Sequence, residues 1–236
     1  MLWVATYNRA VHPDGNPGRF RDLTIDQFAA RLASSDPVPG GGSASAIAAA
    51  LGASLVTMVA SLTTGRPKYV DHEPMLAWAL EIGPRLSDHF LVLADEDAEA
   101  YAGYAAALKL PRETEPEIGA RKQAMQAAAR ASSEAPLRCL EACVDLVAAA
   151  EALAGRSNPN AASDVDVAAR LGEAAARGAA ANGLINLPST GDTDYEGTTT
   201  ARVMELLSAI EDLASQAHQA VASGERREPV ELAGRA

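Results

Sequence analysis

The stretch of this sequence that most constrains its fold is a run of small and apolar residues at positions 40–63, GGGSASAIAAALGASLVTMVASLT. The run carries no charged side chain, and alanine is the best helix former among the amino acids. Glycine and alanine also allow neighbouring helices to approach closely. We therefore expect a long helix that begins in the glycines, ends near Leu62 and packs tightly against other helices.

The remainder of the chain also favours helices. Of its 236 residues, 48% are hydrophobic but only 4% are aromatic, so a core has to be built from Ala, Leu, Val and Ile. No segment shows the sustained alternation of apolar and polar residues that indicates a strand, and no tandem repeat is present. The sequence predicts an all-α fold, a single-domain multi-helix bundle.

Apolar residues at helical spacing and clusters of turn residues place the individual helices. The first begins near Thr24, whose spacing with Gln27 fits a capping box, and ends before Asp36-Pro37. After the glycine-led helix, four further helical zones are expected, over 74–109, 115–153, 161–185 and 199–223.

Two prolines and the two ends of the chain complete this outline. Pro84 and Pro136 fall inside helical zones, where each is expected to kink or split its helix. Residues 1–20 are expected to form a flexible N-terminal arm, residues 21–223 the helical domain, and residues 224–236 a flexible tail.

The charge of the chain excludes one class of partner. The formal net charge is −11 and the isoelectric point is about 4.8, so the cationic surface that binds nucleic acid is missing. One segment, 43–62, is apolar and long enough to be weighed as a membrane span, but it carries several hydroxyl side chains and is followed by polar sequence. We expect neither nucleic acid nor a membrane as partner.

The cysteines and histidines indicate compartment and metal content. Cys139 and Cys143 are four residues apart on an expected helix, where two small buried side chains in a reducing compartment fit best. The first residues lack the basic region and cleavage site of a secretory signal, so a cytoplasmic location is expected. The four histidines show no ligand spacing, and no metal is expected.

The glycine run itself allows several interpretations. A dinucleotide-binding loop needs a third glycine where Ser45 stands and a strand before it, and a Walker A loop needs a Gly-Lys-Ser/Thr ending; both are missing. A plain helix start with Ser43 as cap or first-turn residue stays open. So does a site for a carboxylate or carbonyl ligand, because glycines permit close approach and free N–H groups at a helix start attract anions.

Several separated segments of the chain form an ordered set of motifs. They are PGGGS (39–43), GRPKY (65–69), DEDAEAYAGYAAALKLP (95–111) and GRSNPNAASDVDVAARL (155–171) followed by NGLINL (182–187). In this order they resemble the cyclodeaminase/cyclohydrolase family of folate enzymes, which includes the C-terminal domain of formiminotransferase-cyclodeaminase. The resemblance covers about residues 22–215.

The resemblance implies an all-α homodimer with a folate site between the subunits and no metal or redox cofactor. The substrate is then a reduced folate that carries one carbon unit. It also implies which residues form the site. The catalytic candidates are Asp97, Lys68 and Asp164, and the substrate-binding candidates are Gly40, Gly41, Gly42, Ser43, Tyr69, Tyr101, Asn158, Asn160, Asn182 and Asn186.

The chain departs from the family pattern at two places. Leu184 stands where the family often has an arginine, and the basic run before the Lys-Tyr pair is reduced to Arg66-Pro67-Lys68. Both changes remove positive charge that could contact the anionic tail of a folate.

The candidate residues suit the chemistry that the resemblance implies. Hydrolysis of the methenyl cation needs a base for the attacking water and a group that tolerates positive charge, and Asp97 suits both, with Asp164 as second candidate. Lys68 could protonate a leaving amine or hold a carboxylate. Each residue also has an ordinary role open to it: a solvated helix face for Asp97, a solvated loop for Lys68, and turns, caps or structural amides for the asparagines.

Three functions follow from this reading. We expect hydrolysis of 5,10-methenyltetrahydrofolate to 10-formyltetrahydrofolate, because no formiminotransferase domain stands in the chain to hand over a formimino substrate. The first alternative is a formiminotetrahydrofolate cyclodeaminase, which releases ammonia from the same pocket. The second is a non-catalytic helical dimer that binds folate or serves as a scaffold.

Overall fold

The computed structural model describes residues 18–230, and within them the chain forms six α-helices and no strand. Short 3-10 turns at Phe20–Asp22, Pro67–His72, Pro159–Ala161 and Leu187–Thr190 join the elements. The helices are α1 (Ile25–Leu32), α2 (Gly41–Thr63), α3 (Glu73–Leu108), α4 (Glu115–Leu153), α5 (Ala162–Asn186) and α6 (Thr193–Ser223).

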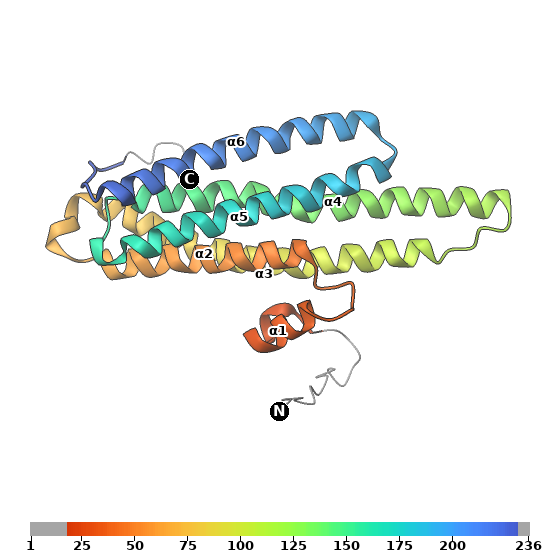
Figure 1. The fold of residues 1–236 in the computed structure, drawn as a ribbon, viewed down its shortest axis with the longest axis horizontal. Coiled ribbons are helices and arrows are strands. Elements are labelled where there is room, and N and C mark those ends of the chain that lie inside the picture. Colours follow the sequence, from red (N-terminus) through yellow and green to blue (C-terminus); the bar gives the residue numbers. More distant parts are fainter. Residues whose placement is uncertain (1–17, 231–236) are drawn as a thin grey trace, which may run out of the picture.

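Five of the helices form an elongated bundle, as Figure 1 shows. α2 packs on α3 and α5, α4 packs on α5 and α3, and α6 covers α4 and α5. The ends of α3 and α4 run past the others as a hairpin, while the short α1 stands at the side of the bundle (Figure 1). The predicted all-α bundle is confirmed.

Local signals explain most of the helix boundaries. Thr24 and Gln27 form the predicted capping box at the start of α1, and Thr114 forms a second one with Glu117 at the start of α4. α6 begins at Thr193, six residues before the predicted start, because the Asp192 side chain accepts the Tyr195 N–H at 2.9 Å and caps the helix there.

The two prolines were expected to kink or break their helices, and the expected break is wrong at both positions. Pro84 lies inside the single helix α3 and Pro136 inside the single helix α4. Each proline costs one backbone hydrogen bond. Pro136 is buried in the bundle, where tertiary packing outweighs that local loss.

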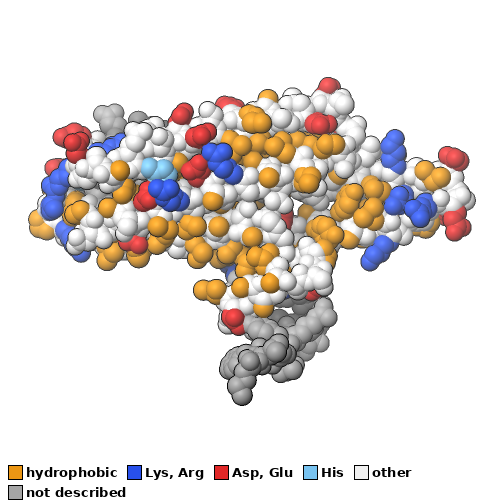
Figure 2. All heavy atoms as spheres, viewed as in Figure 1, with side chains coloured by type: hydrophobic (Ala, Val, Ile, Leu, Met, Phe, Trp, Pro, Cys, Tyr) orange, Lys and Arg blue, Asp and Glu red, His pale blue; other side chains and the backbone are white. Residues whose placement is uncertain are grey.

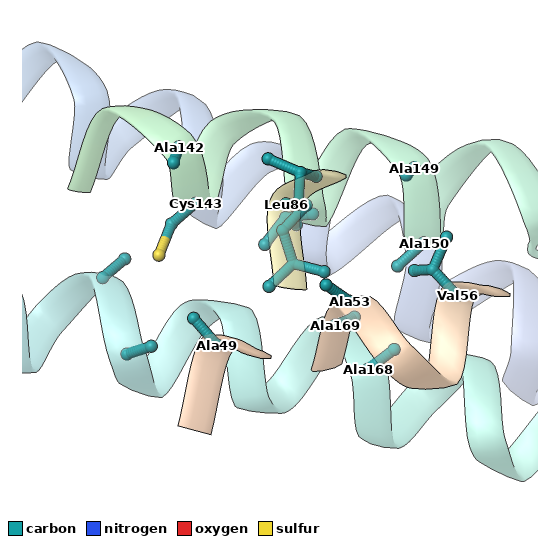
Figure 3. Packing of buried hydrophobic residues seen from close by; sticks show 14 of the residues in the cluster. Ala49, Ala53, Val56, Leu86, Ala142, Cys143, Ala149, Ala150, Ala168 and Ala169 are labelled. Carbon is teal, nitrogen blue, oxygen red and sulfur yellow. The ribbon is translucent and has the colours of Figure 1, made fainter. Parts of the chain in front are cut away.

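Small side chains build the core. Figure 3 shows Ala49, Ala53 and Val56 of α2 against Leu86 of α3, with alanines of α4 and α5 around them. The contacts are close enough to need glycine: an ideal β-carbon at Gly52 would lie 3.2 Å from the Ala168 carbonyl oxygen on α5. The predicted tight alanine packing is confirmed, and Cys139 and Cys143 are buried and free within it.

The two ends of the described chain make specific contacts. Phe20 is buried and its N–H donates to Asp95 Oδ1 at 2.8 Å, although it falls in the predicted arm. Residues 224–230 contact the loop after α4, although they fall in the predicted tail. The rest of that arm and tail, 1–17 and 231–236, lies outside the described residues.

α2 is long and apolar enough to cross a membrane by length and composition, as the sequence suggested. Half of its most apolar window is buried inside the bundle. The core helix of a soluble protein passes the same test, and the packing of α2 on α3 and α5 fits that explanation.

Candidate active site

Asp97 on α3 is bound to the first turn of α2. The Ser43 hydroxyl lies 2.9 Å from Asp97 Oδ2 and 3.0 Å from the Ala94 carbonyl oxygen, and Ser43 itself is fully buried. The backbone N–H of Ser43, in the first turn of α2, also bonds to this carboxylate, which belongs to the chain itself. The N-cap position is occupied by Gly40, so Ser43 is a first-turn residue that holds an acid.

Burial sets the proton affinity of this acid. Removal from water raises the pKa of Asp97, and the hydroxyl and N–H of Ser43 only partly oppose that rise. A carboxyl group that is held in one orientation, with a pKa above the ordinary aspartate value, is suited to take and return a proton.

The glycines at the start of α2 leave room for this arrangement. An ideal β-carbon at Gly42 would lie only 2.5 Å from Asp97 Cγ, so no other residue fits there without moving the acid. A β-carbon at Gly41 would lie 3.1 Å from the Asn182 side-chain nitrogen. Gly40 is more open, with the Pro37 carbonyl oxygen 3.7 Å from such an atom.

Two amides and a hydroxyl group lie across from Asp97. Asn182 Nδ2 donates to the Gly178 carbonyl at 2.9 Å, and Asn186 Nδ2 donates to the carbonyls of Asn182 and Ser132. Their amide oxygens are left to accept other hydrogen bonds. The Ser132 hydroxyl is buried and has no partner among the described residues.

These groups line one cleft of about 250 Å³, which we name the acid cleft. Of the predicted site residues it contains Gly40, Gly41, Asp97, Tyr101, Asn182 and Asn186, with Gly42 and Ser43 directly behind Asp97. The remaining lining residues were not predicted: Pro37, Val38, Tyr104, Ser132 and Ile185.

The other predicted residues lie at the opposite end of α2. Lys68, Tyr69 and Asn158 line a separate cavity of about 160 Å³, which we name the basic cavity. Tyr69 is buried, and Lys68 Nζ lies 5.6 Å from the centre of its ring. The Asn158 N–H donates to Thr63 Oγ1 at 3.1 Å, which ties this loop to the last turn of α2.

Asn160 and Asp164 are near this cavity but are not part of its lining. The Asn160 N–H donates to Asn158 Oδ1, so Asn158 caps a turn, which is the structural role that the sequence left open. Neither Asn160 nor Ser163 caps α5, whose N-cap is Ala161 without a side-chain bond. Asp164 is half-buried in the first turn of α5.

Sequence reasoning missed residues of two kinds. Tyr104 and Ile185 lie within one helical turn of the predicted Tyr101, Asn182 and Asn186, and helix periodicity could have found them. His72 lies three residues after Tyr69 in the same 3-10 turn, so local spacing could have found it as well. Arg226 lines the basic cavity through contacts distant in sequence, for which no local signal exists.

Comparisons with known proteins identify the family of this chain. The family model for formiminotransferase-cyclodeaminase matches residues 24–205. The methenyltetrahydrofolate cyclohydrolase of Methylorubrum extorquens is 38% identical over 172 residues, which are 73% of this chain and 83% of that protein. The formimidoyltransferase-cyclodeaminase of Rattus norvegicus is 33% identical over 83% of this chain, but the match spans only 36% of that longer protein.

A solved structure shows the same fold. The formiminotetrahydrofolate cyclodeaminase of Thermotoga maritima superposes with a TM-score of 0.78 at 27% identity, and the match covers 86% of this chain and 98% of that one. The order of the helices, the sequence motifs and the extent of these matches all agree. This chain belongs to the formiminotransferase-cyclodeaminase family.

Proposed function

We propose that this protein is a methenyltetrahydrofolate cyclohydrolase that works as a homodimer, with each site formed between two subunits. The observation that carries the proposal is Asp97, a partly buried acid with a raised pKa that Ser43 holds at the wall of the acid cleft. The similarity to a cyclohydrolase over 83% of that relative's length selects the reaction.

Asp97 supplies what the hydrolysis needs. Water attacks the bridging carbon of the methenyl cation, and the carboxylate takes the proton that the water loses. The bond from that carbon to N5 then breaks as N5 receives this proton. The hydroxyl group of the adduct loses its own proton to solvent, which leaves the neutral formyl group on N10. The negative charge of Asp97 also stabilises the cationic substrate in the cleft.

The division of the site residues supports a shared site. α2 spans about 33 Å from Gly41 to Thr63 at 1.5 Å per residue. The acid cleft lies at its first turn and the basic cavity beyond its last, so the length of this helix separates them. In the proposed dimer, one chain contributes two partial sites rather than one complete site.

An unpartnered apolar face on α2 supplies the surface for a dimer. Leu51, Met58 and Leu62 are 55%, 36% and 43% exposed and follow one another at helical spacing. Figure 2 shows hydrophobic side chains gathered along the edge of the molecule where α2 runs. Two such helices packed antiparallel about a twofold axis bring the acid cleft of one subunit beside the basic cavity of the other.

Cyclodeamination is the second candidate, and the Thermotoga structure is the observation that favours it. In that reaction N10 attacks the formimino carbon, the proton of N10 passes to the imino nitrogen, and ammonia leaves once that nitrogen has received a second proton. The protonated form of Asp97 could supply the proton to the leaving nitrogen, which is consistent with its raised pKa.

Two assays on the purified protein test the proposal. Loss of the near-ultraviolet absorbance of 5,10-methenyltetrahydrofolate reports hydrolysis, and ammonia release from 5-formiminotetrahydrofolate reports deamination. We expect accelerated loss of the absorbance band and little ammonia. Ammonia release with no hydrolysis would support the second candidate, and inactivity with both substrates at micromolar protein would contradict both enzymatic functions.

A further inference from the structure

The segment that follows α6, Gly224–Val230, lies against the basic cavity, and we name it the strap. The Arg227 N–H donates to the Gly155 carbonyl at 3.0 Å, and the Arg227 guanidinium donates to Glu151 Oε1 at 2.5 Å. From the other side, Arg156 Nε donates to the Glu228 carbonyl at 2.6 Å. These bonds fix the backbone on both sides of residue 226.

The contact between the strap and the loop after α4 requires a glycine at position 155. Its φ of +73° belongs to the left-handed region, and an ideal β-carbon there would lie 2.8 Å from the Glu225 carbonyl oxygen and 3.0 Å from Arg227 Cδ. The strap therefore packs directly on the backbone of the loop after α4, and any side chain at position 155 would displace it.

The strap adds a second cation to the basic cavity. Arg226 Cζ lies 5.9 Å from the centre of the Tyr69 ring, at nearly the same distance as Lys68 Nζ at 5.6 Å. Neither cation forms an ion pair with any residue of the described chain, although Glu225 is also part of the lining. Arg156, by contrast, is occupied by Glu228 and by carbonyls of α4.

One further donor of the cavity lacks a partner. His72 lines the same cavity, and its buried Nδ1 has no hydrogen-bond partner among the described residues. Burial, helped by the charge of Arg156, lowers the pKa of His72 and keeps the ring neutral at neutral pH. The cavity thus combines two unpaired cations, an aromatic ring and a free ring nitrogen, a set that suits a carboxylate ligand.

We propose that the strap makes Arg226 a substrate-binding residue, which together with Lys68 holds carboxylates of the glutamate tail of the folate. This inference rests on the proposed function for the identity of the ligand. The strap lies outside residues 24–205, the part of the chain that the family model matches. Arg226 supplies positive charge where the sequence before Tyr69 is reduced to Arg66-Pro67-Lys68.

A binding experiment without chemistry tests this role first. The probe is p-aminobenzoyl-triglutamate, which carries the tail but no reactive carbon, titrated calorimetrically into the full-length protein. We expect Arg226→Gln to weaken binding about fivefold, Arg226→Lys to retain most of the affinity, and added salt to reduce the difference. Arg202→Gln on α6 is the control, because Arg202 is also an exposed arginine and lines neither cavity.

Gly155→Ala tests the position of the strap without a change of charge. It should weaken binding of the probe about as much as Arg226→Gln does, because the added methyl group displaces the strap. Unchanged affinity in both variants would overturn the inference, and so would an equal loss in Arg202→Gln.

Steady-state kinetics separate this inference from the proposed function. With triglutamyl 5,10-methenyltetrahydrofolate, Arg226→Gln should raise KM about fivefold and leave kcat unchanged. If the wild type hydrolyses the substrate and Arg226→Gln has the same KM as the wild type, the role of Arg226 is contradicted but the proposed function is not. A protein that binds the tail through Arg226 but hydrolyses nothing would contradict the cyclohydrolase alone.

Discussion

The two ends of α2 carry opposite kinds of chemistry. At its first turn, the acid cleft holds a partly buried carboxyl group, two amides and a buried hydroxyl group, and no cation lines it. Beyond its last turn, the basic cavity holds Lys68, Arg226 and the Tyr69 ring, with no comparable buried acid in its lining. The acid cleft has a group that can move a proton, and the basic cavity has groups that can hold an anion. Each cavity therefore has a kind of group that is missing from the lining of the other.

Of the substitutions that test this difference between the two ends of α2, Asp97→Asn should cause the largest loss of activity. Loss of the base is expected to lower kcat for the methenyl substrate about a thousandfold, with KM little changed. Thermal unfolding should show a stability equal to or above that of the wild type at neutral pH, because the variant no longer buries a charge. A folded variant that keeps its activity would remove Asp97 from the mechanism, and a variant less stable than the wild type would contradict the cost assigned to the buried charge.

Leu51→Asp should separate the subunits. A charge on the exposed apolar face of α2 cannot be buried against a second α2, so we expect monomers by analytical ultracentrifugation and at least a hundredfold loss of activity. Met204→Asp is the matched control, because Met204 is 58% exposed on α6 and should tolerate the charge. An active monomer would show that one chain holds a complete site.

Gly42→Ala should disturb the acid cleft alone. The added methyl group overlaps the Asp97 carboxylate, so we expect a loss of activity of about tenfold to a hundredfold and a loss of about 1–3 kcal/mol in unfolding free energy. Gly197→Ala on α6 is the control, since no atom lies within 4 Å of its ideal β-carbon. Binding of a folate tail fragment in the basic cavity should be unaffected by either change.

The pH dependence should show the smallest effect. Because the pKa of Asp97 is raised in the fold, kcat/KM for hydrolysis should rise with pH through a value above the ordinary aspartate pKa. The folded state also holds this proton more tightly than the unfolded chain, so the acid destabilises the fold as pH rises through that window. The gain in stability of Asp97→Asn should therefore grow from acidic to neutral pH; a gain that shrinks would contradict the raised pKa.

The sequence predicted elements better than distances between them. Periodicity and caps placed the helices. The largest misplaced boundary is the start of α6, because the cap at Asp192 was not recognised, and α1 ends at Leu32, a few residues before the predicted stop. The ordered motifs predicted a set of site residues but not their division between two ends of α2, since spacing along a chain does not give direction in space. The role of Arg226 was out of reach, because it depends on where the strap packs.

The central claim is that each site takes the acid cleft from one subunit and the basic cavity from the other. Co-expression of Asp97→Asn and Lys68→Ala chains with different affinity tags, followed by purification through both tags, isolates the mixed dimer. The assay uses triglutamyl substrate far below KM, so that loss of tail binding at Lys68 lowers the rate as loss of Asp97 does. A shared site predicts that one of its two sites carries both substitutions and the other none, so the mixed dimer should regain about half of wild-type activity. Activity no higher than that of the two parent variants would contradict the account.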